Sequence, residues 1–118
     1  MGNPLSKPTY IGTIGELLVQ LRLLEFGIQA APPIKDSGND LIAIKMEAVK
    51  FIQVKTTTIN DFNLSRLPKI YHIIAEVDLK FDKDRKLLLD KSKIFIIKKG
   101  ERNKRELTQN LADEIWGK

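Results

Sequence analysis

The sequence predicts one α/β domain in which a mixed central sheet is flanked by an N-terminal and a C-terminal helix. Three observations favour this class: an apolar stripe at helical spacing opens the chain, several β-branched or continuously apolar runs follow, and a second helical pattern closes it. Of the 118 residues, 42% are hydrophobic and 30% are charged, a composition typical of a folded domain with its own core. We expect residues 1–8 to be a flexible N-terminus and residues 9–118 to form the domain.

The first helix is expected over residues 9–26. Five apolar side chains recur there at helical spacing and form one stripe: Ile14, Leu17, Leu18, Leu21 and Leu24. Gly27 then supplies a stop signal. Thr13 stands three residues before Glu16, which is the spacing of a capping box, so the regular helix is expected to begin near Ile14.

The middle of the chain predicts strands separated by turns. A short strand at 28–31 should end at the two prolines that follow, because proline cannot donate to a ladder. Strands at 40–45 and 49–57 are joined by a hairpin connection at 46–48, and the second strand is rich in β-branched residues. The region is completed by a polar loop at 58–69, a strand at 70–79, a charged turn at 80–86, a short strand at 87–89 and a strand at 94–97.

The C-terminal segment, residues 102–116, predicts the second helix. Its inward side chains are expected to be Leu107, Leu111, Ile115 and Trp116. Because the order is helix, strands and helix, the chain implies an α/β sandwich around a mixed sheet.

Polar residues interrupt the two strands of the predicted hairpin. Asp40 opens the first strand, and Gln53 and Lys55 stand within the second. Because residues two apart on a strand point to the same face, Gln53 and Lys55 should share one face of the sheet. A register in which residue 42 pairs with residue 53 places Asp40 across from them. A carboxylate, an amide and an ammonium group therefore converge on one patch.

This patch suits metal-dependent hydrolysis of a phosphodiester. A hard cation such as Mg²⁺, or Mn²⁺ in its place, takes oxygen ligands. Asp40 would be the main anionic ligand, and the Gln53 side chain and the Val54 carbonyl would add neutral ligands. Lys55 would orient a water or offset charge on the phosphate. Glu16, which shares a helix face with Gln20, would reach the same metal from the side.

The arrangement resembles the PD-(D/E)xK nuclease superfamily, and within it the archaeal Holliday junction resolvase-like and restriction-endonuclease-like proteins. The matching stretches are Gly15-Glu16, 37–43 and 51–57. The resemblance implies a restriction-endonuclease-like core that cleaves DNA with a divalent metal. By motif position, Glu16 matches the helix glutamate, Asp40 the aspartate and Lys55 the lysine.

The chain departs from the family pattern at two positions. Asn39 stands where the pattern has proline, and Gln53 stands where it has Asp or Glu. A neutral oxygen binds a dication more weakly than a carboxylate does. One metal instead of two, weak binding of the metal, and an inactive site therefore all stay open.

Basic and hydroxyl side chains offer contacts for a polyanionic partner, since the net charge is +5 and the pI is about 9.5. The predicted DNA-binding residues are Gln20, Thr56, Thr57, Lys98, Lys99 and Arg102. Each has a plainer alternative, a solvated surface for the basic run and β-propensity for the threonines. The basic residues at 80–86 are a second candidate, weakened by interleaved aspartates. His72, Glu76 and Asp78 share one strand face, which is either solvated or a wall of a groove beside the site.

Three function classes follow from these observations. The first is a DNA endonuclease, with branched DNA among its candidate substrates. It is expected to act as a homodimer, because cutting two strands needs two sites. The second is a nuclease-fold module that binds nucleic acid without cleaving it, and the third is an interaction subunit of a defence or toxin system. The absence of cysteine fits a reducing cytoplasm, and no apolar run approaches the roughly 18 residues that span a membrane.

Overall fold

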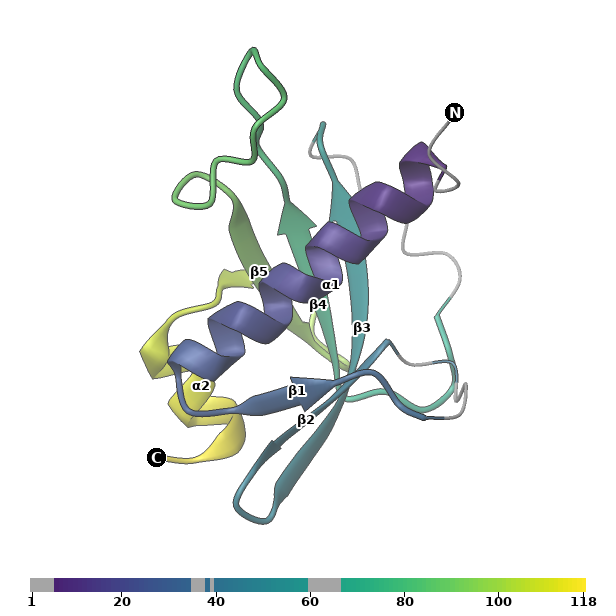
Figure 1. Cartoon of the computed structure of the whole chain (residues 1–118). Helices are drawn as coiled ribbons and strands as arrows, with labels where there is room; N and C mark the ends of the chain where they lie inside the picture. The colour runs from purple at the N-terminus through teal and green to yellow at the C-terminus, as the bar shows by residue number, and fades with distance from the viewer. Residues whose placement is uncertain (1–5, 35–37, 39, 60–66) are drawn as a thin grey trace.

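The computed structural model describes residues 6–34, 38, 40–59 and 67–118. Within these residues six strands form one sheet in the order β1-β2-β3-β4-β5-β6. The strands are β1 (Gln29–Ala31), β2 (Leu41–Lys45), β3 (Ala48–Thr57), β4 (Ile73–Asp78), β5 (Lys93–Lys98) and β6 (Arg105–Glu106). β3 and β4 run parallel and the other neighbours run antiparallel. This mixed sheet and its two terminal helices confirm the predicted fold class (Figure 1).

The first helix, α1 (Lys7–Glu25), begins before the expected start. Ser6 caps it, because its hydroxyl accepts a hydrogen bond of 3.4 Å from the Thr9 N–H. Thr13 lies inside the helix, where its hydroxyl donates to the Thr9 carbonyl over 2.8 Å. The expected capping box at Thr13 is therefore wrong, and Lys7 and Pro8 belong to the helix. Residues 1–5 of the expected flexible N-terminus lie outside the described residues.

The apolar stripe expected on α1 is split between two faces. Gly15 and Leu18 are buried, whereas Leu17, Leu21 and Leu24 are 57%, 47% and 61% exposed. The cause is Gly15, whose missing side chain lets the helix backbone approach Thr56 of β3; a Cβ atom there would collide with the Thr56 side chain. This contact turns the three leucines away from the sheet.

Both helices cover the same face of the sheet, so the domain has two layers. α1 packs on the β3 face that carries Ile52, Val54 and Thr56. The second helix, α2 (Gln109–Trp116), is tied to residues that share this face by register: Glu114 lies 3.1 Å from Lys98 and 2.7 Å from Arg105. The buried residues of α2 join α1 and this face in one apolar cluster.

The C-terminal segment differs from the expected helix. A short strand, β6, pairs with β5, and α2 begins only after Thr108, whose hydroxyl accepts a 3.2 Å hydrogen bond from the Leu111 N–H. Leu107, Leu111 and Trp116 are buried as expected. Two other expected strands are reduced: β4 is shorter than 70–79, and at 87–89 the structure has only an isolated bridge between Phe81 and Leu87. Of the expected loop at 58–69, residues 60–66 lie outside the described residues.

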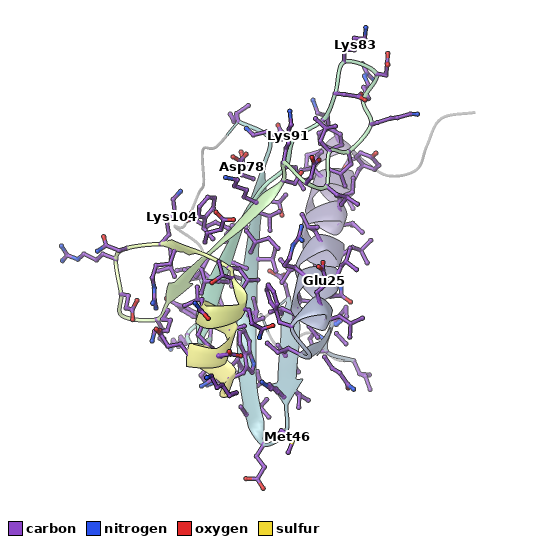
Figure 2. All side chains as sticks on the ribbon, turned by 90° about the vertical axis from the view of Figure 1, so that its left-hand side faces the viewer. Glu25, Met46, Asp78, Lys83, Lys91 and Lys104 are labelled. Carbon is purple, nitrogen blue, oxygen red and sulfur yellow. The ribbon has the colours of Figure 1, made fainter. Side chains whose placement is uncertain are left out.

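The β2–β3 hairpin has a tighter turn than expected. Lys45 pairs with Ala48, so only two residues connect the strands, and Met46 adopts a left-handed φ of 56°. Ile42 therefore pairs with Phe51 instead of residue 53. Because the shift is two residues, every side chain keeps its expected face. Figure 2 shows this turn, marked by Met46, at one end of the molecule and a second hairpin, marked by Lys83, at the other.

Candidate active site

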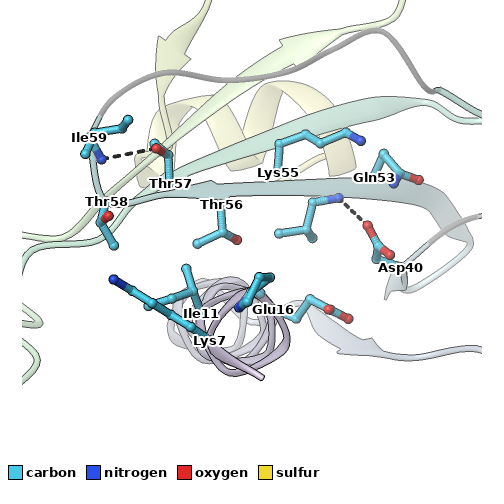
Figure 3. Close-up of a pocket in the computed structure, with 13 residues that line it drawn as sticks. Lys7, Ile11, Glu16, Asp40, Gln53, Lys55, Thr56, Thr57, Thr58 and Ile59 are labelled. Carbon is cyan, nitrogen blue, oxygen red and sulfur yellow. Dashed lines mark hydrogen bonds between the residues drawn. The ribbon is translucent and has the colours of Figure 1, made fainter. Parts of the chain in front are cut away.

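A cleft of about 490 Å³ lies between the N-terminal half of α1 and the last residues of β3. It is lined by all the residues predicted for the catalytic and metal site: Glu16, Asp40, Gln53, Val54 and Lys55. Figure 3 shows α1 below β3 and Asp40 beside the strand. The residues that line the cleft thus come from a helix, a hairpin entry and a strand.

Gln53 and Lys55 belong to one face of the sheet, and Asp40 lies at the edge of β3 beside them. Leu41 pairs with Ile52, so Asp40 stands level with Gln53, and alternation gives Gln53 and Lys55 the same side of β3. In Figure 3 both side chains point away from α1, while Thr56 points toward the helix. Gln53 and Lys55 therefore lie on the face away from α1, whereas the Asp40 carboxylate lies beside β3 on the side toward the helix (Figure 3).

The carboxylate of Asp40 is fixed at the edge of β3. Its Oδ2 accepts a 2.8 Å hydrogen bond from the Val54 N–H, and the Asp40 N–H donates to the Ile52 carbonyl over 3.1 Å. These bonds show that residues 52 and 54 turn their backbone groups toward the β2 side. Because β2 begins only at Leu41, the Val54 carbonyl meets no β2 partner along the described strand.

Glu16 reaches the site around this edge from the helix side. In Figure 3 its carboxylate extends from α1 toward Asp40. Burial raises the pKa of Glu16 above its usual value, and the negative charge of Asp40 raises it further. Because Thr13 lies within the helix, Glu16 does not serve the expected capping box. Two carboxylates that repel each other in a partly buried cleft are an arrangement that a cation would stabilise.

The oxygens of the cleft fit a hard divalent cation. Gln53 Oε1 is buried and has no hydrogen-bond partner in the described structure, although buried acceptors are normally satisfied. Asp40, Glu16, Gln53 and Val54 line the cleft with carboxylate, amide and carbonyl oxygens, the ligand type that Mg²⁺ takes. No group of three or more His, Asp or Glu side chains in the described residues is placed to hold a metal. The set therefore depends on an amide and a carbonyl beside two carboxylates.

β4 adds a buried carboxylate to the same sheet face. Glu76 pairs in register with Lys55 and is only 3% exposed, so a solvated strand face is excluded for it. Its Oε1 lies 3.4 Å from the Nζ of Lys104, which also lies over the Phe95 ring. Lys104 was not predicted as a residue of the catalytic site. The parallel pairing of β3 with β4 is the information that would have placed Glu76 beside Lys55.

His72 has a structural role at the start of this face. Its Nδ1 accepts a 2.8 Å hydrogen bond from the Phe51 N–H, and the two rings lie 5.2 Å apart. Burial lowers the pKa of His72, and the charges of Lys50 and Lys99 lower it further. A ring whose Nδ1 accepts a backbone hydrogen bond holds the fold together at the start of β4.

The predicted DNA-binding residues are only partly assembled at the cleft. Thr56 and Thr57 line it, although Thr56 packs against α1 and the Thr57 hydroxyl accepts a 3.1 Å hydrogen bond from the Ile59 N–H. Gln20 instead lines a separate groove between α1 and β1.

The basic run after β5 does not line the cleft. Lys98 is paired with Glu101 and Glu114. Lys99 donates a 2.6 Å hydrogen bond to the Lys69 carbonyl, whereas Arg102 is exposed. Two of the three predicted phosphate contacts therefore serve the fold.

Comparisons with known proteins show the fold and leave the family open. No model of a known protein family matches this chain, and no curated protein matches it in sequence. Among solved structures, the fold is similar to that of a bacterial homing endonuclease, I-Ssp6803I, with 15% sequence identity and a TM-score of 0.57. The match covers 92% of this chain and 77% of that chain. The chain thus shares its α/β fold with a nuclease. Neither helix in the described residues is long and apolar enough to cross a bilayer.

Proposed function

We propose that this protein is an endonuclease that hydrolyses DNA phosphodiesters with a divalent metal ion. The observation that carries the proposal is the cleft in which Glu16, Asp40, Gln53 and Lys55 come together from separate segments of the chain. The homing endonuclease with the same fold supports it, since that protein acts on DNA as a nuclease. The order and spacing of these residues support a place in the PD-(D/E)xK superfamily, with residues 9–118 as one nuclease domain. Branched or junction DNA is the proposed substrate shape.

The residues of the cleft have distinct proposed roles. Asp40, Gln53 Oε1, the Val54 carbonyl and Glu16 would hold Mg²⁺ or Mn²⁺, which supplies an activated water and polarises the phosphate. Asp40 is held in place by the Val54 N–H, so it binds as a preorganised ligand. Lys55 offsets the negative charge that develops on the phosphate. Thr56 and Thr57 would contact phosphate oxygens at the far wall of the cleft.

A cleavage assay with three variants tests the proposal. Duplex, single-stranded and four-way-junction DNA are each incubated with Mg²⁺ or Mn²⁺. We expect the wild type to cut and Lys55→Ala to lose at least about a hundredfold in rate, because charge on the phosphate is then unopposed. Gln53→Glu should cut with equal or stronger metal dependence. The control is Lys50→Ala, which changes a lysine on the same strand outside the cleft and should cut like the wild type.

The outcome that rejects a nuclease is plain. A wild type that is inert on every substrate with both metals, or a Lys55→Ala variant that cuts as fast as Lys50→Ala, contradicts the proposal.

The second candidate function, a nucleic-acid-binding module without cleavage, is favoured by one observation: Gln53 replaces the acid of the family pattern. Metal titration separates the two, because an active site should bind Mn²⁺ and lose affinity in Asp40→Ala.

We also propose that the protein acts as a homodimer in the cytoplasm. β5 pairs with β4 and β6, and the buried side of α2 packs on the sheet. The outer face of α1 is available instead, with Leu17, Leu21 and Leu24 exposed at helical spacing. Light scattering should show a dimer that Leu21→Glu dissociates without unfolding the chain. A monomeric wild type would reject this assembly.

A further inference from the structure

A hairpin beyond β4 forms a compact arm, which we define as residues 80–91. The Leu88 N–H donates to the Lys80 carbonyl over 2.8 Å, and the Asp82 N–H donates to the Lys86 carbonyl over 2.9 Å. A bridge between Phe81 and Leu87 joins the two sides. Figures 1 and 2 show the arm extending past the end of the sheet, with Lys83 at its tip. The base of the arm packs on the core through Phe81 and Leu87, and its tip projects from the body (Figure 2).

The exposed charge at the tip of the arm is more positive than the mixed sequence of 80–86 indicates. The carboxylate of Asp82 accepts backbone hydrogen bonds from Asp84 at 2.8 Å and Lys86 at 2.9 Å, so its charge is directed into the turn. Lys83, Arg85 and Lys86 are exposed around it, with Asp84 as the exposed carboxylate between them. The aspartates between the basic residues weakened 80–86 as a predicted DNA-binding segment. One of them, Asp82, instead stabilises the turn through its backbone hydrogen bonds.

Arg85 occupies a backbone conformation that other residues suit better. Its φ is 65°, in the left-handed region where glycine and asparagine are usual. The Arg85 N–H closes the turn with a 3.1 Å hydrogen bond to the Asp82 carbonyl. The turn therefore presents a guanidinium group at a position where glycine would serve the fold.

The arm leaves the sheet next to the cleft. β3 and β4 are parallel and end together, with Thr57 paired with Asp78. The Leu79 N–H donates to the carbonyl of Thr57, a cleft-lining residue, over 2.9 Å. The N-terminal end of α1, with Lys7 on the cleft wall, lies at the same end of the molecule (Figure 1). A duplex with one phosphate in the cleft would run past this end.

We infer that the arm binds the phosphate backbone of duplex DNA beside the cleft through Lys83, Arg85 and Lys86, independently of base sequence. The inference rests on the proposed function and adds the place where the flanking duplex is held. Cationic side chains on a projecting turn neutralise phosphates, and each such contact contributes to the salt dependence of binding. The arm positions DNA and takes no part in the chemical step.

Binding of short duplexes of two unrelated sequences, measured by fluorescence anisotropy in a salt series without Mg²⁺, tests the arm. The double variant Lys83→Gln/Lys86→Gln should weaken binding of both duplexes equally. The slope of log affinity against log salt should become shallower by about 2, which is about 1 for each lost phosphate contact. Arg85→Asn, which suits the left-handed backbone, should also weaken binding while thermal unfolding stays as in the wild type.

A matched control carries the same change in charge. Lys50→Gln/Lys118→Gln removes two cations toward the other end of the molecule and should keep the wild-type slope. At saturating DNA with Mg²⁺ the arm variants should cut at the wild-type rate. If the wild type binds and cuts but the arm and control variants give the same slope, the arm inference is overturned and the nuclease proposal stands. If the wild type binds no duplex, the arm inference is overturned; the nuclease proposal falls with it only if the wild type is also inert on single-stranded and junction DNA.

Discussion

Glu16 and Asp40 show how single residues set the conditions of the site. A helix and a hairpin entry bring the two carboxylates into one cleft, where burial and mutual repulsion raise the pKa of Glu16. The Val54 N–H meanwhile stabilises the Asp40 carboxylate. Asp40 is thus the preorganised anion, and Glu16 is the group whose charge depends on pH and on a bound cation.

The raised pKa of Glu16 predicts a pH dependence with a definite sign. A cation needs the ionised carboxyl, so Mn²⁺ affinity should fall as pH falls through the raised pKa, beginning above the ordinary value of 4.5. Without metal, the folded state binds the proton more tightly than the unfolded chain. The stability from this group is therefore present at low pH and lost as pH rises through its folded-state pKa.

Calorimetric Mn²⁺ titrations and thermal unfolding across this pH range check both effects. Glu16→Gln should bind Mn²⁺ more weakly at neutral pH and lose this part of the pH dependence. The metal-free variant should be more stable than the wild type at neutral pH, because the repulsion from Asp40 is gone. Superimposable pH profiles for the two proteins would reject a role for Glu16 at the metal.

The residues that line the cleft were easier to predict from the sequence than the surface contacts were. Gln53 and Lys55 are polar residues in an apolar strand, and alternation assigns both to one face even though the predicted register was wrong by two residues. The partners of the surface lysines could not be predicted from strand alternation. Lys98 and Lys99 look like free cations in the sequence, and only the folded chain brings them to Glu114 and to the Lys69 carbonyl.

At the scale of elements, Gly15 determines how α1 meets the sheet. The apolar spacing in α1 fits two different faces, one with Leu17, Leu21 and Leu24 and one with Leu18 and Leu23. Periodicity alone does not decide between them. The close approach of Gly15 to Thr56 does, and it also turns Glu16 toward the cleft.

Two glycine substitutions in α1 test this packing. Gly15→Ala places a methyl group against the Thr56 side chain and should lower the free energy of unfolding by about 1–3 kcal/mol. Gly12→Ala meets no atom within 4 Å in the same helix and should raise it by about 0.5–1 kcal/mol. Chemical denaturation measures both. Equal effects of the two substitutions would contradict the proposed contact between α1 and β3.

The bounds of β6 and α1 depend on contacts that the local sequence pattern does not contain. Residues 102–108 carry a helical pattern, yet β5 offers an edge that recruits Arg105 and Glu106 as β6. The capping signal at Thr13 is overridden because Ser6 caps an earlier start. In each case a contact or a cap outside the local pattern decides the outcome.

At the scale of the whole molecule, the sheet edge creates the site. β2 stops at Leu41, so β3 continues beyond it with its backbone turned toward the cleft. In the described part of the chain both helices pack on one face of the sheet, and Gln53 and Lys55 belong to the opposite face. Sequence could predict the mixed sheet and its terminal helices. It could not predict that both helices lie on one face, because that depends on long-range packing.

Locating a bound Mn²⁺ ion by anomalous scattering from a crystal tests the central claim most directly. We predict an ion in the cleft, about 2.0–2.6 Å from an oxygen of Asp40 and from Gln53 Oε1, with Glu16 at or beside it. An Asp40→Ala crystal prepared in the same way should lack the ion. Crystals of the wild type in which Mn²⁺ is absent from the cleft, or bound without Asp40 and Gln53, would contradict the account.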